Sequence, residues 1–138
     1  MPPRRRIDPS AGHAAVGQWL AAQSGQDEGE PAPVAVDRQV LATAVRFTLE
    51  ELGARAPGRS VEVRVPPLGV VQCVEGSTHR RGTPPAVVEM DAATWLALAT
   101  GRVAWVDAVG AGSVQASGQR ADLASHLPLV EDAGARRA

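Results

Sequence analysis

The sequence predicts an α+β fold in which helices cover one face of a sheet. Apolar residues recur at helical spacing over 37–52, and apolar and charged residues alternate at strand spacing over 61–65. Glycine and proline then divide the rest of the chain into short elements. Because the strands are grouped early and most helices follow them, we expect the helices to lie together on one side of the sheet.

The strongest helix signal extends from Asp37 to Leu52. Its apolar positions fall at offsets of four, eight and eleven and therefore lie on one stripe, at Leu41, Val45, Leu49 and Leu52. Asp37 is a suitable N-cap, and Gly53 is expected to end the helix.

Two strands are predicted to follow as a hairpin. Valines alternate with Glu and Arg in residues 61–65 (VEVRV), and Pro66 and Pro67 end this strand. A second β-branched run at 69–74 (GVVQCV) is close enough to pair with the first through a short turn. Residues 75–85 (EGSTHRRGTPP) are expected to be a loop.

The second half of the chain is predicted to be a series of short elements. In order these are a strand at 86–90, helices at 92–100 and 102–109, a strand at 113–117 and a helix at 120–127. Asp91 is placed to cap the first of these helices, Gly101 to end it, and Pro128 to end the last.

The length of 138 residues suits one domain. Residues 1–33 are expected to be an N-terminal arm and linker, with one helix between Ile7 and Gln23 that Gly17 weakens. Residues 34–130 are expected to form the domain, and 131–138 a flexible tail.

Charge and hydropathy exclude several classes of partner. With 14 basic and 15 acidic residues the net charge is −1, which disfavours nucleic acid as a partner. No segment approaches the roughly 20 apolar residues that span a bilayer, so stable membrane insertion is not expected. Arg4, Arg5 and Arg6 precede no unbroken apolar stretch of the kind found in signal peptides. A soluble, cytoplasmic protein is predicted.

Residues for covalent chemistry are not found at a diagnostic spacing. The histidines, His13, His79 and His126, are far apart in sequence, and Cys73 lies in an apolar strand, where a thiol is typically buried and inert. No Cys/His spacing indicates a metal site. We therefore expect no catalytic residue, no metal and no cofactor, and predict that the protein is not an enzyme.

Residues 88–127 (VEMDAATWLALATGRVAWVDAVGAGSVQASGQRADLASHL) resemble the C-terminal half of sterol carrier protein type-two domains. The landmarks of that pattern are caps, turns and apolar helix positions, at Asp91, Leu98, Gly101, Ala108, Gly112, Gly118, Leu123 and Leu127. Together with the VEVRVPPLG segment, they are most similar to the compact bacterial, actinobacterial-type branch. The resemblance implies a mostly antiparallel sheet of about five strands, covered by helices on one face.

The resemblance also implies a function, which is the binding of a fatty acyl, sterol-like or other lipid in an apolar cavity between helices and sheet. The candidate ligand-binding residues are Phe47, Trp95, Leu98, Trp105, Val109, Leu123 and Leu127. The residues by themselves favour a second interpretation for the two tryptophans, in which they fill the core, because a chain with few aromatic residues needs them to occupy volume.

A structural or interaction module is the alternative function. Such a module would act as a homodimer or as an accessory partner of an enzyme such as a mycothiol-dependent isomerase-type protein, since related domains are attached to enzymes of that type. A hollow interior favours the carrier, whereas a filled interior with an exposed apolar patch favours the module.

Overall fold

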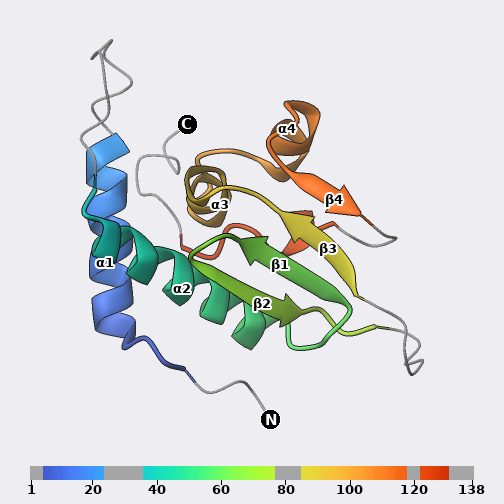
Figure 1. Cartoon of the computed structure of the whole chain (residues 1–138), viewed down its shortest axis with the longest axis horizontal. Coiled ribbons are helices and arrows are strands. Elements are labelled where there is room, and N and C mark those ends of the chain that lie inside the picture. The colour runs from blue at the N-terminus through green and yellow to red at the C-terminus, as the bar shows by residue number, and fades with distance from the viewer. Residues whose placement is uncertain (1–4, 24–35, 77–84, 118–121, 131–138) are drawn as a thin grey trace.

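The computed structural model describes residues 5–23, 36–76, 85–117 and 122–130 (Figure 1). Its elements are α1 (Pro9–Gln23), α2 (Arg38–Arg55), β1 (Val61–Val65), β2 (Gly69–Cys73), β3 (Ala86–Glu89), α3 (Ala92–Ala99), α4 (Trp105–Gly110), β4 (Gln115–Ser117) and a 3-10 helix (Ala124–His126). The predicted α+β class is confirmed. The described residues form four strands rather than about five.

The four strands form one mixed sheet in the order β2-β1-β3-β4. β1 and β2 form the predicted antiparallel hairpin, with Val61 opposite Cys73 and Val65 opposite Gly69. The β3–β4 pair is also antiparallel, whereas β1 and β3 run parallel. The sheet is therefore antiparallel in two of its three pairings.

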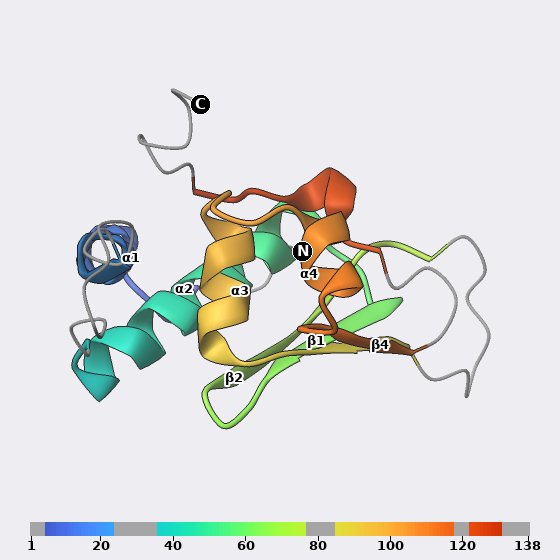
Figure 2. The ribbon, with the colours of Figure 1, turned by 90° about the horizontal axis from the view of Figure 1, so that it is seen from above.

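The core lies between this sheet and the helices. In Figure 2 the sheet is seen nearly edge-on, with α2, α3 and α4 on the same side of it. The strand residues that face the helices are fully buried valines, at Val61, Val63, Val65 and Val88. Their neighbours in the strands, Glu62 and Arg64, form an ion pair on the other face. One face of the sheet is thus apolar and covered, and the other is polar.

Helix α2 has the predicted start and a later end. The Asp37 side chain accepts a hydrogen bond from the Gln39 N–H at 2.8 Å, which satisfies one of the free donors of the first turn. The expected end at Gly53 is wrong, because Gly53 is buried inside the helix and the helix continues to Arg55. Ala56 ends it, since a residue before a proline is disfavoured in helical geometry.

The short C-terminal elements differ in extent from the prediction. After α3, the N–H groups of Arg102 and Val103 donate to the Ala97 carbonyl, so the chain turns before α4 begins at Trp105 instead of residue 102. The helix expected at 120–127 is only a one-turn 3-10 helix within the described residues. Residues 118–121, at the start of that prediction, lie outside the described part of the chain.

Helix α1 lies within the predicted Ile7–Gln23 segment and packs against α2 (Figure 1). Its buried positions recur at helical spacing, at Gly12, Ala15, Val16 and Trp19. This part of the expected arm therefore contributes to the core. The boundaries of the arm, the domain and the tail stay predictions, as does the loop at 75–85, most of which lies outside the described residues.

Candidate ligand-binding site

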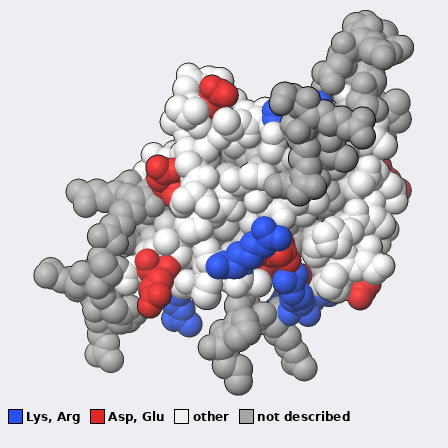
Figure 3. All heavy atoms as spheres, turned by 180° about the vertical axis from the view of Figure 1, so that it is seen from behind, with Lys and Arg blue, Asp and Glu red and all other residues white. Residues whose placement is uncertain are grey.

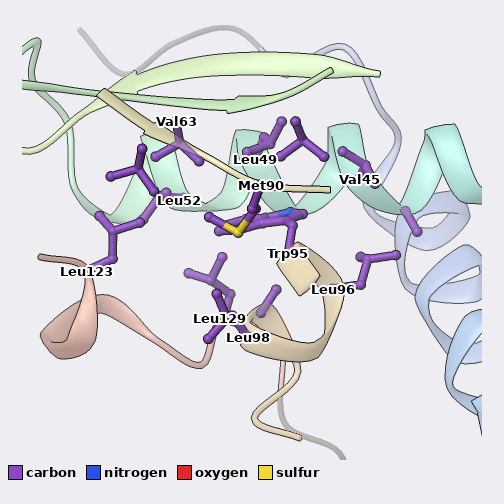
Figure 4. Close-up of a cluster of buried hydrophobic side chains, with 14 of the residues drawn as sticks. Val45, Leu49, Leu52, Val63, Met90, Trp95, Leu96, Leu98, Leu123 and Leu129 are labelled. Carbon is purple, nitrogen blue, oxygen red and sulfur yellow. The ribbon is translucent and has the colours of Figure 1, made fainter. Parts of the chain in front are cut away.

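Three of the candidate ligand-binding residues meet in the interior between helices and sheet. Trp95 and Leu98 lie on α3, and Leu123 lies just before the 3-10 helix. None of the three side chains is more than 1% exposed. Figure 4 shows them around the Trp95 ring, with Met90 beside it at the end of β3.

A hydrogen bond fixes the orientation of Trp95. The indole Nε1–H donates to Thr48 Oγ1 at 2.8 Å, and the Thr48 hydroxyl in turn lies 2.8 Å from the Ala44 carbonyl, one helical turn earlier in α2. In the part of the chain that the structure describes, every buried side-chain nitrogen or oxygen has a hydrogen-bond partner. The described interior is therefore apolar, and its side-chain polar groups are already paired.

Side chains from every layer occupy the space between α2, α3 and the sheet. The buried cluster drawn in Figure 4 includes Val45, Leu49, Leu52, Val63, Met90, Trp95, Leu96, Leu98, Leu123 and Leu129. Trp95 lies near the centre of this cluster and contributes its full volume to it.

Phe47 lies on the side of α2 that faces α1. Its ring centroid is 4.9 Å from that of His13, with the two planes at 63° in an edge-to-face arrangement. Phe47 is 1% exposed because α1 covers it. The structure thus places this candidate at a helix–helix contact, while Trp95, Leu98 and Leu123 converge at the helix–sheet contact.

The remaining three candidates are nearer the surface, with Trp105 and Val109 on α4 and Leu127 directly after the 3-10 helix. Trp105 and Leu127 are partly buried and pack against the core, whereas Val109 is 43% exposed. Val103 and Val106, which were not among the candidates, are also exposed, Val106 by 72%. Sequence reasoning used the three-residue recurrence of these valines to predict a helix. The helix α4 that forms there has only six residues, and Ala108 is its buried side chain. The valines around it therefore stay exposed.

Several apolar residues are exposed on and beside α4, together with the exposed carboxylate of Asp107. Figure 3 views the molecule from the side of the helices and shows a largely uncharged surface, with a few acidic groups and with basic and acidic groups side by side near its lower part. We call Val103, Trp105, Val106 and Val109 the α4 patch. Val106 and Val109 are three positions apart on one helix and therefore share a face. Large contiguous apolar patches mark binding surfaces, and these exposed side chains are the apolar surface on α4 from which such a contact could be built.

The described residues with potentially reactive side chains include Cys73 on β2 and His126 in the 3-10 helix. Burial raises the pKa of Cys73 to about 11, so its thiol is protonated at neutral pH and a poor nucleophile. Among the described residues, no group of three or more His, Cys, Asp or Glu side chains could hold a metal ion. His79 lies outside the described residues, and His126 lies in the 3-10 helix.

The fold and the site define a class of protein, namely a small α+β domain in which helices bury an apolar interior against a mixed sheet. A family model described as a bacterial SCP ortholog matches residues 37–129. Because this match covers more than half of the chain, the protein belongs to that sterol carrier protein-like family. No curated protein matched the chain. In the described part of the chain, no helix has the length and apolarity needed to cross a membrane.

Proposed function

We propose that this protein is a non-catalytic, cytoplasmic carrier that binds an apolar ligand such as a fatty acyl chain or a sterol-like lipid. Membership of the sterol carrier protein-like family supports a carrier role. The observation that carries the proposal is the α4 patch, which leaves apolar side chains exposed directly after α3, the helix that bears Trp95.

Helix α4 is the element best suited to admit the ligand. It has six residues, no side-chain hydrogen bond at its N-cap Ala104, and Ala108 as its buried residue. Such a short helix is marginal without tertiary packing. Displacement of α4 would bring Trp105, Val109 and Leu127 into contact with the ligand. The ligand would then reach the interior cluster around Trp95.

Burial of apolar surface would supply the affinity. Each buried CH₂ group of a ligand contributes about 0.8 kcal/mol, so a long acyl chain gains enough to offset some repacking of the interior. Because the buried side-chain polar atoms of the described residues already have partners, few of them are available to hydrogen-bond a ligand. Selection would therefore depend on the size and shape of the apolar part.

Two valines provide a matched test. Val109 lies in the α4 patch, whereas Val70 lies on the β2 edge strand and is 57% exposed. We expect Val109→Asp to weaken binding of a fluorescent fatty acid by about tenfold or more, because a charge would enter the apolar contact. Val70→Asp should leave binding unchanged. The absence of micromolar binding of acyl chains, acyl-CoA and sterols to the unmodified protein would refute the carrier function.

The buried cluster around Trp95 and the exposed α4 patch also support a second candidate, an interaction module that acts as a homodimer or as an accessory to an enzyme. Native mass spectrometry of the freshly purified protein separates the two. A co-purifying lipid on a monomer supports the carrier. A lipid-free dimer that Val106→Asp converts to monomer supports the module.

A further inference from the structure

Strand β2 forms one edge of the sheet and pairs only with β1 among the described strands (Figure 1). The Arg64 carbonyl of β1 accepts a hydrogen bond from the N–H of Met90 at 3.1 Å, on the side of β3. Because backbone groups alternate in direction along a strand, the odd-numbered residues of β1 face β2, where the register places them opposite the odd-numbered residues of β2. The N–H and C=O groups of Val70 and Gln72 therefore point away from β1, toward the free edge.

Helix α2 and its C-cap close both ends of this edge. The Leu68 carbonyl, just before β2, accepts a hydrogen bond from Arg46 Nε at 2.8 Å. The N–H of Val74, just after β2, donates to the carbonyl of the C-cap Ala56 at 2.6 Å. Val74 has a φ of +64°, an unusual value for a β-branched residue, and the extended strand ends there. Among the described residues, the open part of the edge is therefore the pair of outward-facing residues between these two contacts.

The open edge lacks the features that keep edge strands from pairing with another chain. Such strands are commonly protected by charged side chains, prolines or bulges. The sequence of β2 (GVVQC) has no charged residue and no proline, and each of its residues has a register partner in β1 without a bulge. Val70 is 57% exposed, and Gln72 is exposed as well. The backbone of β2 is thus accessible for a further pairing.

We propose that β2 pairs antiparallel with β2 of a second copy of this chain, about a twofold axis between the two Val71 residues. Val70 then lies opposite Gln72 of the partner subunit, and Gln72 lies opposite Val70 of the partner subunit. Because both residues face outward, each of these is a hydrogen-bonded pair, in which two residues exchange both of their backbone hydrogen bonds. The second copy satisfies every open N–H and C=O of this edge.

The charges beside the edge favour a second copy as the occupant. In β1, Arg64 lies opposite Val70 and Glu62 lies opposite Gln72, with both charges on the outer face of the sheet. The twofold axis brings the Val70 row of one subunit into line with the Gln72 row of the other. Each row across the joined sheet then has an arginine at one end and a glutamate at the other, and no like charges share a row. The strand is therefore complementary to itself in charge as well as in hydrogen bonding.

This contact is small and separate from the site proposed above. Stable complexes bury roughly 1,200–2,000 Å² in total, and the pairing of one short strand buries less, so the dimer should dissociate on dilution. Helix α4 directly precedes β4, which is the other edge strand of the sheet. The inference is therefore independent of the α4 patch and of the ligand-carrier function.

Analytical ultracentrifugation of the full-length protein tests the pairing. Val70→Pro removes an N–H that faces away from β1, a position at which edge strands tolerate proline. We expect this variant to weaken dimerisation about tenfold or more, because the twofold axis removes the same hydrogen bond twice. Val70→Thr, which keeps the N–H, and Val106→Asp, in the α4 patch, should dimerise like the unmodified protein. A monomer at every concentration up to about 1 mM, or a dimer that Val70→Pro leaves intact, would overturn the proposal.

Cysteine crosslinking tests the register. Val71 would lie opposite Val71 of the partner subunit in a non-hydrogen-bonded pair, where side chains approach most closely. Val71→Cys should therefore form a disulfide between subunits on mild oxidation, since the native Cys73 is fully buried. Val70→Cys introduces a more exposed thiol but lies opposite a glutamine, so it should crosslink more slowly. Faster crosslinking of Val70→Cys would contradict the twofold pairing.

Amide exchange keeps the test valid if Val70→Pro does not fold. In the unmodified protein, the amides of Val70 and Gln72 should exchange more slowly as the protein concentration rises, because only the dimer protects them. The Val71 amide faces β1 and should be equally protected at all concentrations. Exchange at Val70 and Gln72 that does not change with concentration would overturn the proposal.

Discussion

The indole of Trp95 and the hydroxyl of Thr48 form a fully buried hydrogen bond that joins α3 to α2. The Nε1–Oγ1 distance is 2.8 Å, and both residues have no exposed surface. The bond links two helices through residues that are 47 positions apart in sequence and sets how the largest buried ring lies over the sheet. The packing of the interior therefore depends on a polar side chain within an apolar cluster.

Replacement of Thr48 by Val should destabilise the protein more than its small change in volume implies. The substitution leaves the Trp95 N–H buried without an acceptor, which costs about 1–3 kcal/mol. Thr48→Ser keeps a hydroxyl and should recover most of this loss. Urea unfolding of the three proteins measures the difference. Equal stability of the Val and Ser variants would show that the hydrogen bond contributes little.

Local signals in the sequence predicted much of the fold. Asp37 and Asp91 each accept a hydrogen bond from the first turn of the helix that they were expected to cap. The alternating valines of 61–65 and the following prolines predicted the hairpin of β1 and β2. These signals succeed because caps, turns and alternation act over a few residues.

Local sequence signals did not predict how segments far apart in the chain pair and pack. The parallel pairing of β1 with β3 joins strands separated by a long connection, which no local pattern specifies. Phe47 lies on the same helix as the residues that face the sheet, but it packs against α1, where the close approach of the two helices requires the glycine at position 12. The candidate ligand-binding residues were chosen as one apolar set, whereas the division between buried Trp95 and exposed Val109 required the structure.

Two glycines around α4 should respond differently to alanine. Gly101 has a φ of +81°, a left-handed conformation that costs a residue with a Cβ atom about 1–2 kcal/mol. Gly110 lies at the end of α4 without a positive φ, and a Cβ atom there would have no neighbour within 4 Å. We expect Gly101→Ala to lower the free energy of unfolding by that amount, whereas Gly110→Ala should leave it unchanged or raise it slightly, because alanine favours a helix more than glycine does. Thermal or urea unfolding compares them, and equal effects would contradict this explanation.

The ion pairs of Glu51 should make part of the stability sensitive to acid. Burial acts to raise the pKa of Glu51, but hydrogen bonds and charges from Arg5 and Arg55 outweigh it, and the pKa is lowered from 4.5. The stabilisation is therefore present above pH 4.5 and is lost as the pH falls through the folded-state pKa. Arg5→Ala should raise the pKa of Glu51, which a carboxyl NMR titration measures. An unchanged pKa would exclude Arg5 as a cause.

The thiol of Cys73 should dominate the loss of stability between pH 9 and 11. Burial raises its pKa from 9.0 to about 11 in the folded protein, so the unfolded chain ionises first and stability falls as the pH rises through this window. The chain contains no lysine or tyrosine, the side chains that ordinarily titrate in this range, so the thiol of Cys73 is the side chain expected to respond. Cys73→Ala should have lower stability overall but a flat profile from pH 9 to 11. A profile that still falls in that variant would assign the titration to another group.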